Sequence, residues 1–303
     1  MKWCHNVVSI RPDQFGGSVD QDYNMTTLAV IIVNFNGMRW IKNCLESALE
    51  QEVQVAFDLG IIFVDNGSSD GSADYVRQEF PSISVCEMDE NLGFGSGCNF
   101  GVDESSAEYI VFLNNDTVLP EETLACLLGD LLTRELHAIA AIEAPYESGT
   151  PTLRRTTIDP LGYPIHLFRW DRFSELPSFY FSAVCLLFRK STSADSGGLD
   201  GSFFLYFEDI DWFWRLQLLG YRFDYAQNCT VRHAGHGSTG GHQLSYHRFL
   251  LRNINLPKML IKNLRFANLL WVMPLDVAGY IIPMCSLPSE SNEHSHVLVD
   301  VNQ

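Results

Sequence analysis

Along the first half of the chain, short apolar segments alternate with segments whose apolar residues recur at helical spacing. The continuous apolar runs Leu28 to Val33, Gly60 to Val64 and Tyr109 to Leu113 predict strands that are covered on both faces. Met38 to Glu50 carries an apolar stripe and predicts a helix, and Ile83 to Glu87 predicts another short strand. Helices between strands require right-handed crossovers, so the pattern indicates an α/β fold with a mainly parallel sheet and helices on both faces.

The second half of the chain has a less regular pattern. Glu121 to Leu136 predicts a helix, and Ala138 to Ala144 predicts a strand. Pro145 to Pro177 is rich in Pro, Thr and Arg and predicts an irregular segment. The remaining predicted elements are a strand over Phe179 to Arg189, a turn over Ser191 to Gly198, a helix over Trp212 to Gly220, strands over Tyr221 to Ala226 and Thr230 to His233, and a basic amphipathic helix over Gln243 to Leu264 that bends at Pro257.

The two ends of the chain lie outside this pattern, which predicts one domain over residues 26–264. Residues 1–25 lack the basic start, the apolar run and the cleavage site of a signal peptide, so we expect an N-terminal extension. Residues 265–303 comprise an apolar segment, Asn268 to Cys285, and a polar tail. Two prolines interrupt this segment and it is short for a spanning helix, so we expect at most peripheral contact with a membrane.

The composition is that of a globular, acidic protein. The 303 residues are 46% hydrophobic, which is enough for a substantial core. The 37 acidic and 20 basic residues give a net charge of −17, which argues against a nucleic acid as partner because phosphate contacts need a basic surface. A small anionic substrate would need a local positive charge to offset the acidic surface. A divalent cation held by carboxylates is the usual way in which an acidic protein binds a diphosphate.

The eight cysteines are scattered, and they contain no Cys-x-x-Cys pair that would indicate a zinc site. Several lie among apolar or small residues, as buried free thiols do. We therefore expect a reducing compartment and a cytoplasmic protein, with any membrane contact at the inner face. The cysteines expected to be free are Cys44, Cys86, Cys98, Cys126 and Cys185.

Polar residues directly follow three of the predicted strands. Ligands of parallel sheets bind beyond the carboxyl ends of the strands, so these residues would border a crevice. For Asp65, ligand contact is favoured over a turn that only caps the sheet, because two consecutive strands end in Asn or Asp. Asp116 suits a cation, although Asn, Asp and Thr are also common in polar turns. The residues are Asn34 and Asn36, then Asp65, Asn66 and Asp70, and finally Asn114, Asn115 and Asp116.

A glycine-rich loop from Gly93 to Gly101 enters another predicted helix. Its start matches part of a dinucleotide fingerprint, but Cys98 stands where the third glycine is needed and no strand-end acid follows at the expected distance, so an oxidoreductase is disfavoured. A loop that lets the backbone approach a sugar or a phosphate fits better, and simple turn geometry remains the alternative.

Three carboxylates occur within four residues and are surrounded by aromatic residues. Glu208, Asp209 and Asp211 would resist joint ionisation unless they are solvated, paired or at a metal. Such a setting can raise the pKa of one carboxylate toward that of a general base, and we assign this role to Asp209. Arg215 follows Asp211 by one helical turn and could hold it in a structural pair.

Two histidines, His233 and His236, follow a predicted strand beside a flexible glycine-rich loop. An isolated histidine is more often structural than a ligand. Two of them in a chain already expected to bind a cation are better candidates for metal ligands.

Five of these motifs together resemble the bacterial and archaeal family 2 glycosyltransferases, particularly the rhamnosyltransferase-like branch. The resemblance covers about Thr26 to Leu264 and is specific in order and spacing. It implies a GT-A fold and inverting transfer of a sugar from a nucleoside-diphosphate sugar, such as dTDP-rhamnose or a UDP-sugar, usually with Mg²⁺ or Mn²⁺. It also implies a hydroxyl of a cell-envelope glycan or a lipid-linked molecule as acceptor. The motifs are Val30 to Gly37, Val64 to Ser72, Glu90 to Gly95, Phe112 to Thr117 and Phe204 to Asp211.

The resemblance also implies roles for individual residues. Asp65 contacts the nucleotide base, Asp209 matches the catalytic base, and Asp116 stands at the end of the metal motif. His233 or His236 lies in the loop that often completes the metal and diphosphate site. One departure is Asn114, which replaces the first acid of the metal motif, so the metal would be weakly held without substrate. The further candidates for donor binding are Asn34, Asn36, Asn66, Gly93, Asn115, Glu208 and Arg215.

Two other functions stay open at this point. A nucleotidyltransferase also uses a nucleotide-binding α/β sheet and a metal, but it would not need a carboxylate base among aromatic residues at Asp209. A non-catalytic module that binds a sugar nucleotide would have the same donor site. Loss of sugar transfer on substituting Asp209 would distinguish a glycosyltransferase from both.

Overall fold

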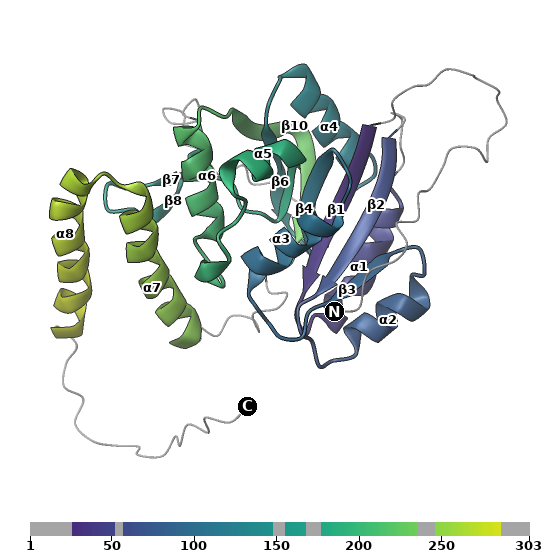
Figure 1. Ribbon diagram of the computed structural model, residues 1–303, viewed down its shortest axis with the longest axis horizontal. Helices are drawn as coiled ribbons and strands as arrows, with labels where there is room; N and C mark the ends of the chain where they lie inside the picture. The colour runs from purple at the N-terminus through teal and green to yellow at the C-terminus, as the bar shows by residue number, and fades with distance from the viewer. Residues whose placement is uncertain (1–25, 52–56, 148–154, 168–176, 236–245, 286–303) are drawn as a thin grey trace, which may run out of the picture. The chain divides into compact units, whose positions relative to one another are not determined.

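The structure is a computed structural model that describes residues 26–51, 57–147, 155–167, 177–235 and 246–285 (Figure 1). The chain divides after Asn263 into two compact units, which are described separately. Both termini and His236 lie outside the described residues.

The first unit is built on an eight-stranded sheet with the order β3-β2-β1-β4-β9-β6-β10-β5. Neighbouring strands among β3, β2, β1 and β4 are parallel, as are β6 and β10, whereas β9 and β5 run antiparallel to their partners. The mainly parallel sheet is therefore confirmed. The strands are β1 (Thr26–Asn34), β2 (Phe57–Asp65), β3 (Ser84–Glu87), β4 (Tyr109–Asn114), β5 (Thr117–Val118), β6 (Ala138–Pro145), β9 (Cys185–Arg189) and β10 (Phe223–His233).

Helices cover both faces of this sheet (Figure 1). Alternate residues of β1 show the two layers, because Val30 belongs to the core that includes α1, while Ile31 meets Gly101 of α3 on the other face. Trp212 of α6 packs its ring on Phe112 of β4, with 6.2 Å between ring centroids. The helices are α1 (Met38–Leu49), α2 (Ser72–Glu79), α3 (Phe94–Glu104), α4 (Thr123–Thr133), α5 (Lys190–Ser196), the short 3₁₀ helix η2 (Gly201–Phe203), α6 (Glu208–Leu218) and α7 (Tyr246–Asn263).

Two predicted irregular segments contain regular structure. Within the segment from Pro145 to Pro177, β7 (Arg155–Ile158) and β8 (Pro164–Leu167) form an antiparallel hairpin. The carboxylate of Asp159 closes its turn by accepting from the amide of Leu161 at 2.8 Å. The predicted turn after β9 is instead helix α5, which the indole of Trp212 holds by donating to the hydroxyl of Ser196 at 2.7 Å.

Three predicted boundaries also change. Strand β9 begins at Cys185 and not at Phe179. The apolar residues before it pack in the core, where the ring of Phe181 contacts aromatic rings of α6 and β10. The two predicted strands near the C-terminal end of this unit are one strand, β10, with a shift of register between Tyr225 and Thr230. Helix α6 begins at Glu208 and not at Trp212, so the acidic cluster lies in its first turn.

One cysteine prediction is wrong. Cys44, Cys98, Cys126 and Cys185 are free thiols as expected. Cys86 is disulfide-bonded, so it gives no support to a reducing compartment. Its position on β3, in an apolar stretch, made it indistinguishable from the free cysteines in the sequence.

In the described part of the second unit, residues 264–285, the predicted apolar segment forms helix α8 (Phe266–Cys285). Several of its large apolar side chains are exposed. Nowhere in the described part of the chain does a helix have the length and apolarity required to cross a membrane. The exposed residues are Phe266, Leu270, Trp271 and Leu275.

Candidate active site

The carboxyl ends of β1, β2 and β4 bring the predicted polar residues together around Asn34. This side chain is fully buried, and the strand register pairs it with Asp65. Its amide donates to a carboxylate oxygen of Asp65 at 3.3 Å and to the hydroxyl of Ser72 at 2.8 Å. Its carbonyl oxygen accepts from the amide of Asn115 at 2.7 Å. The ends of three parallel strands are thus joined by one buried hydrogen-bond network, which holds Asp65 and Asn115 in place.

The loops after β1 and β2 also contact each other. Asn36 has a positive φ of 49°, and its side-chain oxygen accepts from the amide of Ser69 at 2.9 Å. The carboxylate of Asp70 accepts from the amide of Met38 at 2.9 Å, at the start of α1. The two polar clusters predicted at these strand ends therefore form one rim. Of the predicted donor-binding pair, Asn36 in the loop after β1 is exposed, whereas Asn34 at the end of β1 is fully buried.

Asn66 links this rim to the glycine-rich loop. Its amide donates to the carbonyl of Gly93 at 3.0 Å, and its side-chain oxygen accepts from the amide of Leu92 at 3.0 Å. Gly93 has φ +87°, and a Cβ there would lie 2.3 Å from the carbonyl oxygen of Phe204. Close approach of two backbones therefore requires this glycine. Asn66 and Gly93, both predicted to bind the donor, are thus in contact. The turn geometry alone explains why a glycine is required at position 93, without a ligand.

Asp116, His233 and Glu143 form a chain of ionisable groups. Antiparallel pairing of β10 with β5 sets His233 opposite Thr117. Nε2 of His233 lies 3.2 Å from Oδ1 of Asp116, and Nδ1 lies 3.1 Å from Oε2 of Glu143. Burial lowers the pKa of His233, but the hydrogen bonds and charges of the two carboxylates outweigh it and raise the pKa to about 9. Without a bound metal the imidazole is therefore protonated at neutral pH and bridges the two acids, and coordination of a metal by Nε2 would require the loss of that proton.

The donor types around Asp116 fit part of a divalent metal site. The described residues contain no group of three His, Cys, Asp or Glu side chains that could hold a metal ion. Asp116 and His233 supply a carboxylate and an imidazole, both accepted by Mn²⁺, and they are already neighbours. His236 lies outside the described residues. Asp116 and His233 are thus the described residues that would hold the metal, with other ligands from the substrate.

The acidic cluster follows an unusual turn. Phe204, Tyr206 and Phe207 have φ values of 62°, 70° and 73°, a region that non-glycine residues rarely occupy. Such residues each cost about 1–3 kcal/mol and are found at functional sites, where the surrounding structure holds them. The turn leads directly into Glu208 and Asp209 in the first turn of α6. The backbone is thus strained immediately before the predicted base.

Asp209 has the electrostatics of a general base. Burial raises its pKa to about 6, and the charge of Glu143 adds to the increase. Glu208 is 6% exposed, and its Oε2 has no hydrogen-bond partner. Burial, and then the charge of Asp209, raise the pKa of Glu208 well above its usual value. The raised pKa of Glu208 favours its protonated form, and Asp209, with a pKa of about 6, is the carboxylate of the pair that can accept a proton near neutral pH.

Three residues near the base were missed in the sequence. The phenol of Tyr180 has a pKa raised first by burial and then by the charge of Asp209, while Arg252 acts in the opposite direction. Glu143 contacts His233, and its charge raises the pKa of Asp209. The sequence could have indicated a functional role for Glu143, because it is the only charged residue in the apolar run from Ala138 to Ala144.

Asp211 and Arg215 form the structural pair that their spacing indicated. Asp211 is fully buried, and its Oδ2 accepts from Nε of Arg215 at 2.9 Å and from Nζ of Lys262 at 2.8 Å. Its Oδ1 accepts from the amide of Asn263 at 2.8 Å. Arg215 also donates to the carbonyl of Gly198 at 2.6 Å. These contacts join α6 to α7, and the predicted contact of Arg215 with the donor stays a prediction.

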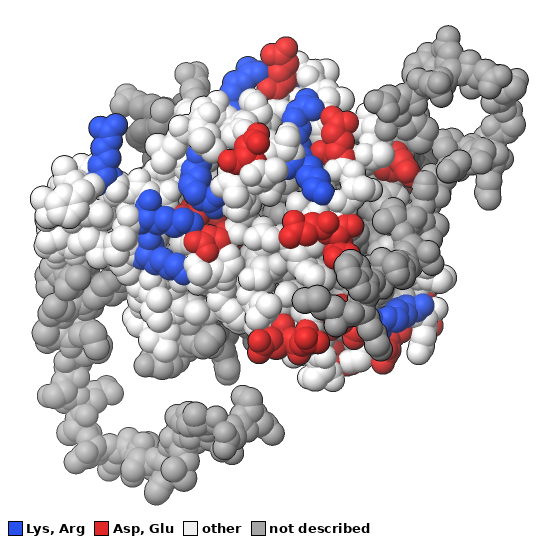
Figure 2. All heavy atoms as spheres, in the orientation of Figure 1, with Lys and Arg blue, Asp and Glu red and all other residues white. Residues whose placement is uncertain are grey.

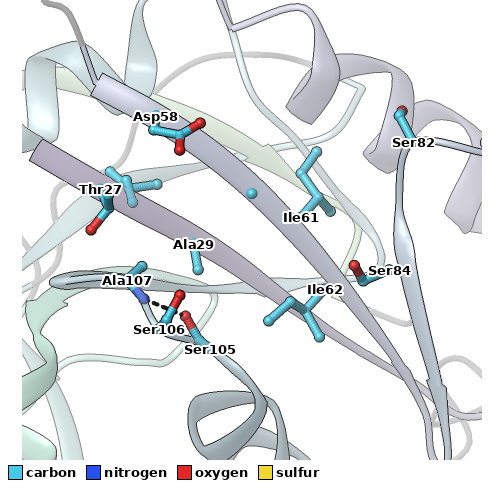
Figure 3. A pocket seen from close by; sticks show the side chains of 12 residues that line it. Thr27, Ala29, Asp58, Ile61, Ile62, Ser82, Ser84, Ser105, Ser106 and Ala107 are labelled. Carbon is cyan, nitrogen blue, oxygen red and sulfur yellow. Dashed lines mark hydrogen bonds between the residues drawn. The ribbon is translucent and has the colours of Figure 1, made fainter. Parts of the chain in front are cut away.

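A small cavity lies at the opposite edge of the sheet, near the amino ends of the strands (Figure 3). It measures about 50 Å³, and its walls include Thr27 of β1, Asp58 of β2, Ser84 of β3 and Ser105. This volume suits a few water molecules and not a sugar nucleotide. The carboxyl edge is therefore the candidate active site.

On the face shown in Figure 2, Lys and Arg side chains are interspersed with Asp and Glu. Nucleic-acid binding requires a continuous basic surface. The described side chains on this face form no such surface.

Residues 29–196 match the family model described as glycosyl transferase family 2. The chain therefore belongs to this family and is a glycosyltransferase. It is 26% identical over 235 residues to N-acetylglucosaminyl-diphospho-decaprenol L-rhamnosyltransferase of Mycobacterium tuberculosis, an alignment that covers 63% of this chain and 72% of that protein.

Solved structures with the same fold show that it is GT-A. The mannosyltransferase PcManGT from Pyrobaculum calidifontis, in complex with GDP-Man and Mn²⁺, has a TM-score of 0.56 at 16% identity, covering 88% of this chain and 80% of its own. GalNAc-T7 with UDP, GalNAc and Mn²⁺ has a TM-score of 0.59 at 13% identity, covering 70% and 44%. At these identities the likeness defines the fold, and the chemistry is argued from the residues of this chain.

Proposed function

We propose that this protein is an inverting glycosyltransferase that moves a sugar from a nucleoside-diphosphate sugar to an acceptor hydroxyl. The observation that carries the proposal is Asp209, a half-buried carboxylate in the first turn of α6 whose surroundings raise its pKa to about 6. The charge of Glu143 adds to this increase, and Glu143 contacts His233, which in turn contacts Asp116 just after β4. A proton acceptor and a candidate metal and diphosphate site thus share one edge of the sheet.

Asp209 acts as the general base of a single displacement. Its carboxylate takes the proton of the acceptor hydroxyl while the hydroxyl oxygen forms a bond to the anomeric carbon of the sugar. The bond from that carbon to the diphosphate breaks on the opposite face, and the configuration inverts. A divalent metal, when bound, would neutralise the negative charge that develops on the leaving diphosphate. Asp116 and His233 are the residues that would hold it.

Donor binding is assigned to the rim formed by the ends of β1, β2 and β4. Asp65 contacts the nucleotide base, with its carboxylate oriented by Asn34. A protonated Glu208 can donate a hydrogen bond to the donor, because its Oε2 is buried without a partner. The other residues proposed for donor binding are Asn36, Asn66, Gly93, Asn115 and Arg215.

The relative in Mycobacterium tuberculosis supports a substrate class. Its name gives L-rhamnose as the sugar and a diphospho-polyprenol that carries N-acetylglucosamine as the acceptor. We infer that this chain likewise adds a deoxyhexose or hexose to a lipid-linked acceptor during cell-envelope synthesis. The match to glycosyl transferase family 2 disfavours the two alternatives, a nucleotidyltransferase and a non-catalytic binding module, neither of which requires an ionisable base at Asp209.

The pH dependence of transfer tests the role of Asp209. Because only the ionised carboxylate accepts a proton, kcat should rise with pH through an apparent pKa of about 6 and level off above it. Initial rates between about pH 4.5 and 8.5, corrected for any unfolding, measure this profile. A rate that is independent of pH across this interval would contradict the assignment.

A lipid-linked acceptor requires contact with a membrane surface, and α8 supplies a candidate. Exposed Trp271 and Leu270 suit the interface between lipid and water. We expect the protein to sediment with phosphatidylcholine vesicles, and the double variant Leu270→Glu/Trp271→Glu to stay in the supernatant. The matched control is Leu218→Glu/Leu219→Glu, at an exposed apolar pair that ends α6. Equal sedimentation of all three proteins would contradict the role of α8.

A further inference from the structure

Asn255 of α7 contacts the strained turn that precedes the catalytic carboxylate. Its side chain is 2% exposed. The amide nitrogen lies 2.8 Å from the carbonyl oxygen of Phe203, 2.9 Å from that of Leu205 and 2.9 Å from that of Tyr206. An amide has two N–H hydrogens, so three backbone acceptors share one donor group.

The turn needs such support because of its backbone conformation. Phe204, Tyr206 and Phe207 all have positive φ, and each would relax toward ordinary regions if its surroundings allowed it. The carbonyl of Phe207 accepts the first helical bond of α6, from the amide of Asp211, whereas the carbonyls of Phe204 and Tyr206 accept from other elements. The amide of Asn255 satisfies the carbonyls at the centre of the turn, immediately before Glu208 and Asp209.

The glycine-rich loop holds the same turn from another element. The amide of Phe94 donates to the carbonyl of Phe204 at 2.8 Å, next to the close approach of Gly93. Asn66, at the end of β2, hydrogen-bonds Gly93 in turn. The position of the turn is therefore defined jointly by α3 and by α7.

We propose that Asn255 is a positioning residue, whose amide holds the Phe204–Phe207 turn in the conformation that presents Asp209 to the acceptor hydroxyl. The inference rests on the proposed role of Asp209 as base. Asn255 acts through the backbone and touches neither substrate nor the reacting atoms. Attachment of α7 is a separate matter, because Lys262 and Asn263 already bind this helix to Asp211.

The experiment compares Asn255→Ala with a control on the same helix. Asn263→Ala also removes a buried amide bond between α7 and α6, but it leaves the turn untouched. With dTDP-rhamnose and N-acetylglucosaminyl-diphospho-decaprenol as substrates, Asn255→Ala should lower kcat about 10- to 100-fold, since small misplacements of a catalytic group have effects of this size. The KM for dTDP-rhamnose should change little, and the acidic limb of the pH profile should move to lower pH as the carboxylate becomes hydrated. Asn263→Ala should have the kcat of the wild type, and the acidic limb of its pH profile should stay at the wild-type position.

Hydrogen–deuterium exchange supplies a readout that does not depend on turnover. In Asn255→Ala, amides from Leu205 to Ile210 should exchange faster, whereas those of β4 should not change. Asn255→Asp, which replaces the donor by an acceptor facing three carbonyls, should show the same effect, and Asn255→Gln should restore part of the activity. Exchange in the turn as slow as in the wild type overturns the proposal, and so does a wild-type kcat in Asn255→Ala. If the wild-type protein transfers no sugar while the turn loosens in the variant, the proposed function fails and the support of the turn by Asn255 stands.

Discussion

Asp209→Asn should lower kcat by about 10²- to 10⁴-fold while making the folded protein more stable. The loss of rate follows from removal of the general base, whose usual contribution has this size. The gain in stability follows from burial, because an ionised carboxylate at this position is costly in the folded state and a neutral amide of the same shape is not. Initial rates of transfer and the midpoint of urea denaturation at pH 7 measure the two effects.

The sign of the stability effect follows from the raised pKa. In the unfolded chain the pKa of Asp209 is near the ordinary aspartate value of 3.8, whereas in the folded protein it is about 6. Between these values the folded state binds more protons, so the free energy of unfolding decreases as pH rises and reaches its reduced level above about pH 6. One pKa unit corresponds to about 1.4 kcal/mol, so the variant gains at most about 3 kcal/mol at pH 7 and nothing near pH 3.5.

Asp103→Asn is the matched control for this prediction, because Asp103 is an exposed acid on α3. It should change neither the rate nor the denaturation midpoint. A kcat of Asp209→Asn within about threefold of the wild type would exclude Asp209 as the base. A decrease in stability at pH 7 would show that the carboxylate is stabilised in the folded state, against its raised pKa.

Asp116→Asn should abolish the stabilisation of the protein by metal and donor, and should lower kcat by about 10²- to 10³-fold. Asp116 is the only acid on its turn and lies next to His233, so its loss leaves no carboxylate from β4 for a divalent cation. The measurement is the thermal midpoint with dTDP-rhamnose, UDP-sugars or GDP-mannose, each with Mg²⁺ or Mn²⁺.

In the wild type we expect at least one of these nucleotide sugars to raise the midpoint, and a chelator to remove the increase. Asp103→Asn serves again as the control and should behave as the wild type. Stabilisation that survives chelation would contradict a metal at Asp116. So would a variant that is stabilised by metal and donor to the same extent as the wild type.

The sequence predicted the sheet well because buried parallel strands leave a local signal. Continuous apolar runs marked β1, β2 and β4, and polar residues at their ends identified the edge where Asn34, Asp65 and Asn115 meet. The hairpin β7–β8 and helix α5 were missed, because a side-chain turn and a tertiary hydrogen bond stabilise segments whose composition is typical of loops.

The site was predicted less completely because its connections are non-local. Glu143 reaches His233 only because β6 and β10 are neighbours in the sheet. Asn255 had the pattern of a polar position on an amphipathic helix, and nothing near it in the chain indicates three carbonyls from a turn about 50 residues earlier. The strained turn itself carries no glycine that would have revealed its positive φ values.

The most direct test of the central claim is the product formed by the wild-type protein. Purified protein is incubated with Mn²⁺, dTDP-rhamnose or a UDP-sugar, and N-acetylglucosaminyl-diphospho-decaprenol, and the glycolipid is examined by mass spectrometry and nuclear magnetic resonance. We predict the addition of one sugar with an anomeric configuration opposite to that of the donor, and no such product with Asp209→Asn. A product with retained configuration, or donor binding without any product, would contradict the account.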